Sequence, residues 1–117
     1  MKIENRLISA LNQEIEFKIG QNANDNFDII DSSNPSDLWF HLSGESSSHV
    51  IASLPFDLKL DKKQKRQIIT QGALLCKQHS KHKSLPKTNI IYTEIKNIEK
   101  TNIPGSVNVT NQKTISI

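Results

Sequence analysis

The chain has 117 residues, of which 35% are hydrophobic and 23% are charged, and its formal net charge is +3. This length and composition predict one soluble globular domain, and no apolar run approaches the ~18 residues that a membrane-spanning helix needs. A single cysteine, Cys76, excludes an internal disulfide. Together with an N-terminus that lacks a signal-peptide pattern, it favours a cytoplasmic location, with the nucleus as the alternative.

The N-terminal third predicts a short helix followed by a strand. Residues 3–12 place four apolar side chains at helical spacing, namely Ile3, Leu7, Ile8 and Leu11. Residues 14–20, EIEFKIG, alternate apolar and charged side chains, which predicts a half-buried strand that ends at Gly20. QNANDN is then typical of a turn, FDII predicts a brief ordered segment, and SSNPSD predicts a loop around Pro35.

Residues 37–54, DLWFHLSGESSSHVIASL, predict two strands joined by a serine-rich loop. Alternation places Trp39 and His41 on the same face of the first strand. If the two strands pair as a hairpin, His49 of the second strand lies on that face as well.

A long amphipathic helix is predicted from Asp61, a plausible N-cap, to about Lys81. Its apolar positions recur at intervals of three and four residues: Ile68, Ile69, Ala73, Leu75 and Cys76. A strand follows in TNIIYTEI, and two short runs, SVNVT and KTISI, predict a closing hairpin. We therefore expect a single α+β domain over residues 1–117, with a mostly antiparallel sheet and one main amphipathic helix packed on it.

The charges are strongly segregated along the chain. Residues 1–56 hold three basic and eight acidic side chains, whereas residues 57–117 hold twelve basic and four acidic ones. The basic half uses lysine almost throughout, and lysine is a point charge suited to backbone phosphates rather than to reading base edges. This distribution favours an anionic partner, most often nucleic acid, although a generally lysine-rich solvated face is the alternative.

Trp39, His41 and His49 allow two interpretations. Side by side at the serine-rich loop, they would form an aromatic patch that stacks on a base and donates hydrogen bonds to phosphate. Alternatively, Trp39 belongs to the core, with its ring nitrogen bonded to a nearby acceptor. Both interpretations stay open from the sequence.

The sequence contains no motif typical of a catalytic or metal site. Asp37, His41 and Ser48 supply the side chains of an acyl-transfer triad, but no nucleophile-elbow pattern surrounds any serine. The histidines and Cys76 lack a zinc-binding spacing, and His79 and His82 lie in a lysine-rich segment that repels cations. We therefore expect no enzyme activity, no metal and no cofactor, and we expect Cys76 to be a small core residue.

The motif DLWFHLSGESSSHVIA resembles the signature of the NFACT-R domain family, in which D-[IL]-W-F-H is followed after seven residues by H-V. EFKIGQNANDNFDII is similar to the family's opening strand and turn, and ALLCKQHSK to its helix end. NIIYTEIKNIEKT and PGSVNVTNQKTISI are similar to its later strands. The resemblance thus runs in order from about residue 15 to the C-terminus, and it leaves residues 1–14 as an N-terminal extension or helix.

The resemblance implies an RNA-binding module. Long members of the family take part in ribosome-associated quality control and contact the large ribosomal subunit and tRNA. The serines at 46–48 stand where those members have Pro-Gly-Ser, which is closer to the short eukaryotic type with a coiled-coil tail. The modules that recruit charged tRNA are absent from this sequence, so the tailing activity is not carried over. Met1 and the expected closing hairpin favour a stand-alone protein.

Charge and resemblance together predict a domain that binds structured RNA, tRNA or rRNA, through phosphate contacts. DNA is a possible alternative ligand, and a ribosomal or ribosome-associated protein is a possible partner. A protein-interaction adaptor of the same fold is the alternative function, and a small hydrolase is a third. The predicted nucleic-acid-binding residues are Lys62, Lys63, Lys65, Arg66, Lys77, Lys81, Lys83 and Lys87, with His41, Ser48 and His49 as a second group.

Overall fold

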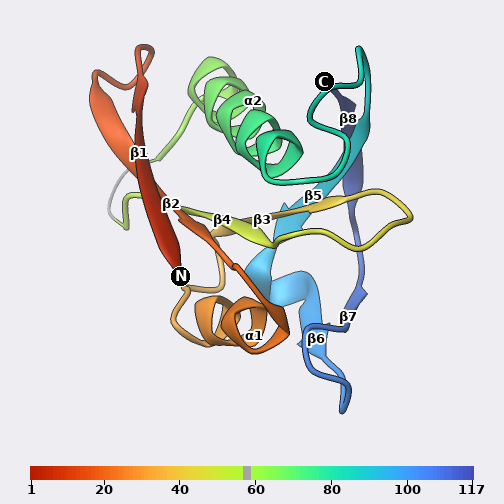
Figure 1. The fold of residues 1–117 in the computed structure, drawn as a ribbon. Coiled ribbons are helices and arrows are strands. Elements are labelled where there is room, and N and C mark those ends of the chain that lie inside the picture. The colour runs from red at the N-terminus through yellow and green to blue at the C-terminus, as the bar shows by residue number, and fades with distance from the viewer. Residues whose placement is uncertain (57–58) are drawn as a thin grey trace.

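The domain is a six-stranded antiparallel sheet with a long helix on one face and a shorter helix on the other (Figure 1). This is a computed structural model, which describes residues 1–56 and 59–117. The strand order is β1-β2-β4-β3-β5-β8, and β6 and β7 form a separate two-stranded ribbon. The elements in chain order are β1 (Lys2–Ile8), β2 (Gln13–Ile19), α1 (Ala23–Asp31), β3 (Leu38–Leu42), β4 (Val50–Ser53), α2 (Lys62–Gln78), β5 (Asn89–Glu94), the 3-10 helix η1 (Ile95–Asn97), β6 (Ile98–Lys100), β7 (Val107–Val109) and β8 (Lys113–Ser116).

Helix α2 covers one face of the sheet and buries the larger core. Its apolar side meets the alternating apolar residues of β2, β3 and β4. Asp61 caps the helix as predicted: its side chain accepts from the Gln64 amide at 2.8 Å, and the Gln64 side chain accepts from the Asp61 amide at 2.9 Å. The helix ends at Gln78, three residues before the predicted boundary.

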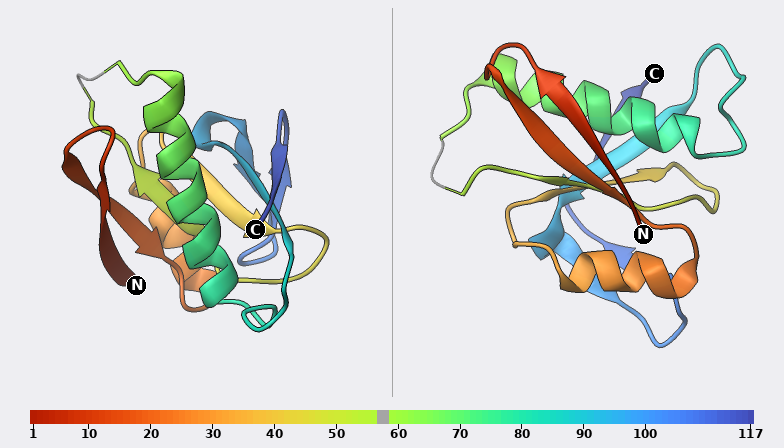
Figure 2. Two further views of the ribbon diagram at one scale, coloured as in Figure 1. Left: turned by 90° about the horizontal axis from the view of Figure 1, so that it is seen from above. Right: turned by 60° about the vertical axis from the view of Figure 1, so that its left-hand side comes forward.

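The opposite face of the sheet carries α1 and the β6–β7 ribbon, so the molecule has three layers (Figure 2). Trp39 and Ile51 are the buried sheet residues of this smaller core, and they pack with Ile29 and Ile30 of α1. Neither helix of the described residues combines the length and the apolar character needed to cross a bilayer.

The predicted helix over residues 3–12 is wrong, because this segment forms strand β1 and the turn after it. Strand β1 pairs with β2 from Lys2 opposite Ile19 to Ile8 opposite Gln13. Ile3 and Leu7 lie on the uncovered face of this edge strand and are 49% and 63% exposed. Their four-residue spacing is also an even spacing, so it fits one face of a strand as well as one face of a helix.

The sequence pattern does not predict the second helix, α1, because its first turn lies in QNANDN, whose composition is typical of a turn. Asn22 acts as the N-cap, and its side chain accepts from the Asp25 amide at 2.9 Å. Asparagine favours both turns and helix N-caps, so the residue type alone does not separate the two.

The closing hairpin is also wrong in its pairing. The two short strands β7 and β8 exist, but β7 pairs with β6 and β8 pairs with β5. Asn111, with φ of 55°, lies between them and lets the chain leave the ribbon for the main sheet. The strands predicted in residues 14–20, 38–42, 49–54 and 88–95 are confirmed as β2, β3, β4 and β5. The α+β class and the mostly antiparallel sheet are confirmed as well.

Candidate nucleic-acid interface

A run of basic residues begins at α2 and continues into the loop after it. From Lys62 to Thr93 the sequence contains eight lysines and arginines and no acidic residue. This segment forms α2, the loop after it and β5. Six of its cations are exposed on the described surface and form no ion pair with another described residue: Lys62, Lys63, Lys65, Arg66, Lys83 and Lys87. We call these six cations, together with Lys77 and Lys81, the basic face.

Lys77 and Lys81 differ from the other members of the basic face because each has a partner. Lys77 is half-buried, and its Nζ donates to the carbonyl of Ile117 at 3.1 Å. Lys81 Nζ lies 2.9 Å from a carboxylate oxygen of Glu45. These two lysines are therefore less available to an external phosphate than the other six.

A groove of about 790 Å³ opens beside the second group of predicted residues. Its floor is the sheet face at Trp39, His41 and Ile91, and one wall is the loop between β3 and β4. The start of α1 and the tip of the β6–β7 ribbon form the other walls. No lysine or arginine lines this groove in the described part of the chain.

Trp39, His41 and His49 lie together, as the strand alternation predicted. The rings of Trp39 and His41 are stacked, with centroids 5.4 Å apart and an interplanar angle of 8°. His49 meets both rings edge-on, at 5.3 Å from Trp39 and 5.1 Å from His41. The indole Nε1 of Trp39 donates to His49 Nδ1 at 3.1 Å. Both earlier interpretations are thus partly realised: Trp39 is a core residue, 1% exposed, and it also lines the groove.

His49 joins three parts of the fold. Its backbone amide donates to Asn26 Oδ1 of α1 at 3.1 Å, and its carbonyl accepts from the Gly20 amide at 2.9 Å. Since Nδ1 is an acceptor, the neutral ring carries its proton on Nε2, next to the backbone of Gly105. Burial, and then the charge of His41, lower the pKa of His49 to about 3. His49 is 1% exposed, so it is a buried residue that connects three parts of the fold and not a surface contact. We call this set of contacts the His49 clamp.

His41 is the more accessible of the two imidazoles. It is half-buried, and its Nδ1 donates to the carbonyl of Leu42 at 2.7 Å. Burial lowers its pKa, so the ring is neutral near pH 7 and Nε2 keeps a free lone pair. His41 therefore offers the groove an aromatic ring with one acceptor nitrogen.

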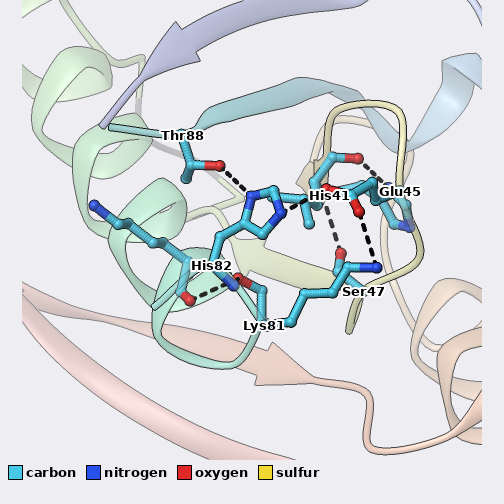
Figure 3. A network of polar contacts seen from close by, with 9 residues as sticks. His41, Glu45, Ser47, Lys81, His82 and Thr88 are labelled. Atoms are coloured by element: carbon cyan, nitrogen blue, oxygen red, sulfur yellow. Dashed lines mark hydrogen bonds and ion pairs between the residues drawn. The ribbon is translucent and has the colours of Figure 1, made fainter. Parts of the chain in front are cut away.

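The loop between β3 and β4 is held by hydrogen bonds within the loop and by ion pairs with the segment after α2 (Figure 3). The Ser47 hydroxyl accepts from the Leu42 amide at 3.0 Å and donates to the Ser48 carbonyl at 3.1 Å. Glu45 contacts Lys81 and also lies 2.5 Å from His82 Nε2. The loop therefore connects the basic face to the groove.

The structure does not assemble the hypothetical triad, because the Asp37 side chain bonds to backbone amides instead of to His41. Asp37 is buried, and its two carboxylate oxygens accept from the amides of Asn34 and Leu54 at 2.9 and 3.0 Å. Its side chain thus closes a loop and holds no histidine. Ser48, the third candidate, is half-buried on the groove wall.

Cys76 lies in the core, where burial raises the pKa of its thiol to about 12. No three histidine, cysteine, aspartate or glutamate side chains in residues 1–56 and 59–117 are grouped so that they could hold a metal ion.

The sequence did not predict two residues of the groove, Asn26 and Gly105. Asn26 is 8% exposed and receives the His49 amide, and Gly105 has φ of +80°. A Cβ on Gly105 would lie 3.0 Å from the Cα and Cβ of Ala23, so glycine lets the ribbon tip approach the start of α1. The PG pair at 104–105 predicts a turn, but its contact with α1 depends on the tertiary fold.

The three-layer fold, with a cationic helix on one face and a groove on the other, is that of a small α+β binding module. A family model described as "NFACT protein RNA binding domain" matches residues 13–111. The chain therefore belongs to this RNA-binding domain family, which supports a nucleic-acid-binding role in general and describes no catalytic one.

The proteins similar to this chain include a vertebrate protein and a solved bacterial structure. Coiled-coil domain-containing protein 25 of Danio rerio is 30% identical over 83 residues, which are 71% of this chain and 40% of that protein. The C-terminal structure of the fibronectin/fibrinogen-binding protein from Streptococcus suis has a TM-score of 0.80 at 23% identity, over 100% of this chain and 45% of that one. The chain thus spans less than half of either relative, and the second likeness concerns the fold alone.

Proposed function

We propose that this domain binds structured RNA, tRNA or rRNA, through the phosphate contacts of its basic face. The observation that carries the proposal is the segment from Lys62 to Thr93, which contains no acidic residue and presents its cations on α2 and the loop after it. The acidic residues of α1 lie on the opposite side of the sheet, so they do not neutralise this surface. The family to which the chain belongs supports RNA as the kind of partner.

The geometry suits contacts to a phosphate backbone. Helix α2 has 17 residues, so its two ends are about 24 Å apart at 1.5 Å per residue. Lysines at both ends would contact phosphates on different turns or strands of a folded RNA. Such contacts fix position and contribute affinity without reading sequence. We further propose a cytoplasmic, ribosome-associated setting, which rests on the resemblance to the long members of the family.

A mobility-shift titration against tRNA, a ribosomal RNA fragment, duplex DNA and single-stranded RNA, at two salt concentrations, tests the proposal. Reversing Lys62, Lys63, Lys65 and Arg66 to glutamate should weaken tRNA binding broadly and flatten its salt dependence. The matched control applies the same change of net charge elsewhere, at the exposed residues Lys2, Lys96, Lys100 and Lys113. Equal losses in both quadruple variants, or none in the first, would contradict the proposal. Stronger binding to duplex DNA than to tRNA would favour DNA as the ligand.

Single substitutions sharpen this test, because the members of the basic face differ in their partners. Lys63 is exposed, whereas Lys77 donates to the Ile117 carbonyl. Lys63→Gln should therefore lower the affinity for tRNA more than Lys77→Gln. The reverse order would place the contact at the C-terminal end of α2.

A second candidate function is protein docking at the free edge of the sheet. Strand β1 pairs only with β2 in the described sheet, and Ile3 and Leu7 are exposed beside this edge. An open edge of this kind accepts a strand from a partner. Ile3→Lys and Leu7→Lys together should abolish capture of such a partner in a pull-down while leaving tRNA binding intact. Loss of tRNA binding in this variant would assign the edge to the RNA site instead.

A further inference from the structure

The groove over Trp39 and His41 has a different chemistry from the basic face. Its volume of about 790 Å³ falls in the range of small-molecule sites, about 300–1,000 Å³. Its lining includes apolar surface from Trp39, Ile91, Val107 and Val109. The charged side chain in the lining is Glu45, which is engaged by Lys81 and His82. With no lysine or arginine in its lining and much apolar surface, the groove favours a neutral, flat and partly apolar ligand over a free phosphate.

Two residues of the lining each keep one polar atom without a hydrogen-bond partner among the described residues. Asn26 is 8% exposed and uses Oδ1 for the His49 amide, which leaves Nδ2 with no hydrogen-bond partner among the described residues. His41 uses Nδ1 for the Leu42 carbonyl, which leaves Nε2 as an acceptor. One unengaged donor and one unengaged acceptor therefore border the same groove, and both belong to rigidly held side chains.

We propose that the groove receives one unpaired nucleobase of a bound RNA, stacked on the face of His41 that is turned away from Trp39. The base would continue the parallel Trp39–His41 stack, and its edge would meet Asn26 Nδ2 and His41 Nε2. Unstacked bases are commonly held in this way, by an aromatic ring and by hydrogen bonds to the base edge.

The proposal gives the two surfaces separate tasks. It rests on the proposed RNA-binding function: the phosphates stay on the basic face, and the base enters the groove. The loop between β3 and β4 borders both surfaces, because Glu45 lines the groove and contacts Lys81. A strand of RNA that follows the lysines after α2 would therefore pass this loop to reach the mouth of the groove on the other face of the sheet.

The first experiment uses nucleosides, which carry a base and no phosphate. Adenosine, cytidine and uridine, each at several millimolar, are titrated into the ¹⁵N-labelled chain, and ribose 5-phosphate is the control. We expect nucleosides to shift the indole N–H of Trp39, the amide of Gly105 and the side-chain amide of Asn26, and ribose 5-phosphate to leave them unchanged. No shift with any nucleoside, or equal shifts with ribose 5-phosphate, would overturn the proposal.

The second experiment compares unpaired with fully paired RNA of one sequence, and unpaired DNA of the same sequence. Ser46→Trp fills the groove wall from an exposed position, and Ser43→Trp is the matched control on the same loop outside the groove. His41→Ala and Ser46→Trp should each weaken binding to unpaired RNA about fivefold or more, near the lower limit for loss of one stacked base. Ser43→Trp should not. Equal losses for paired RNA, or losses in the control, would overturn the proposal.

The two proposals fail separately. If the quadruple glutamate variant of α2 still binds tRNA normally but nucleosides shift Trp39, the basic-face function is wrong and the groove remains a base site. If the glutamate variant loses tRNA while nucleosides and His41→Ala have no effect, RNA is bound by phosphate contacts alone. Equal binding of unpaired DNA and unpaired RNA would show that the groove recognises the base without the ribose hydroxyl.

Discussion

The indole Nε1 of Trp39 donates to Nδ1 of His49 across 3.1 Å, and both residues are 1% exposed. This bond fixes the tautomer of His49 and so directs its other ring nitrogen toward Gly105 at the tip of the β6–β7 ribbon. One histidine therefore attaches the strand pair β3–β4 to the ribbon through its side chain, and to α1 through its backbone. This pair therefore connects the floor of the groove to two of its walls, α1 and the ribbon.

Replacing His49 should destabilise the domain. His49→Ala leaves the buried Trp39 N–H without an acceptor and opens a cavity between sheet and ribbon, which together are expected to cost about 2–4 kcal/mol. Urea denaturation at pH 7, followed by Trp39 fluorescence, measures the change. His79→Ala at the end of α2, where the ring makes no hydrogen bond to a described residue, should cost under about 0.5 kcal/mol. Similar values for both variants would contradict the clamp role of His49.

Stability should fall as the pH is lowered from about 6.5. The pKa of His49 is about 3 in the fold against 6.5 for an ordinary histidine, and the pKa of His41 is lowered as well. Between pH 3 and pH 6.5 the unfolded chain binds more protons than the folded one, so the free energy of unfolding rises with pH over this range. His49 alone contributes a slope of up to about 1.4 kcal/mol per pH unit.

The range from pH 5 to 6.5 isolates this histidine effect. The pKa values of Asp25 and Glu45 are lowered from their ordinary 3.8 and 4.5, Asp25 chiefly by the N-terminal ammonium group and Glu45 chiefly by Lys81. These carboxylates therefore titrate below the range. Urea midpoints across the window measure the slope, which should be smaller in His49→Gln than in the unmodified chain. The same slope in both would exclude His49 as its source.

Gly72 sets the distance between α2 and β3. A Cβ at this position would collide with the ring of Phe40, which is itself fully buried. Gly72→Ala is therefore expected to destabilise the domain by about 1–3 kcal/mol through overpacking, despite the better helix propensity of alanine. Lys63→Ala, on the exposed side of the same helix, should change stability by less than about 0.5 kcal/mol. Thermal unfolding of the two variants tests this, and a stabilised Gly72→Ala would show that α2 shifts freely on the sheet.

The elements that were predicted correctly are those whose pattern is local. In α2 the apolar spacing and the Asp61 cap agree, and in β3 the alternation alone places Trp39 beside His41 on one face. The errors arise where tertiary packing determines the secondary structure or the pairing of strands. Ile3 and Leu7 fit a helix by their spacing, but pairing with β2 makes β1 a strand. Strand β7 is followed directly by β8 in the sequence, which suggests a hairpin of these two strands. In the structure β7 pairs with β6 instead.

In the candidate site, too, the features that depend on local sequence were predictable and those that depend on distant contacts were not. The exposure of the α2 lysines could be predicted, because one continuous segment contains both the lysines and the apolar spacing that defines the buried side of the helix. The clamp of His49 could not, because its partners Asn26 and Gly105 lie in distant segments that meet it only in the folded molecule. Asn26 itself belongs to a helix whose start has the composition of a turn, so neither its helix nor its side-chain contact was predictable.

Glu45 restrains the basic face by engaging Lys81 at 2.9 Å and His82 at 2.5 Å. Glu45→Gln removes this negative charge and releases Lys81 toward solvent, and because the pair is exposed the domain should keep its stability. Affinity for tRNA should rise severalfold, and the plot of log affinity against log salt should steepen by about 0.7–0.9, the contribution of one additional phosphate contact. Filter binding at several salt concentrations measures both quantities. Glu14→Gln, an exposed carboxylate on β2 far from the loop in sequence, changes the net charge equally and should leave the slope unchanged. An identical gain in the two variants would mean that net charge alone, and not the release of Lys81, controls binding.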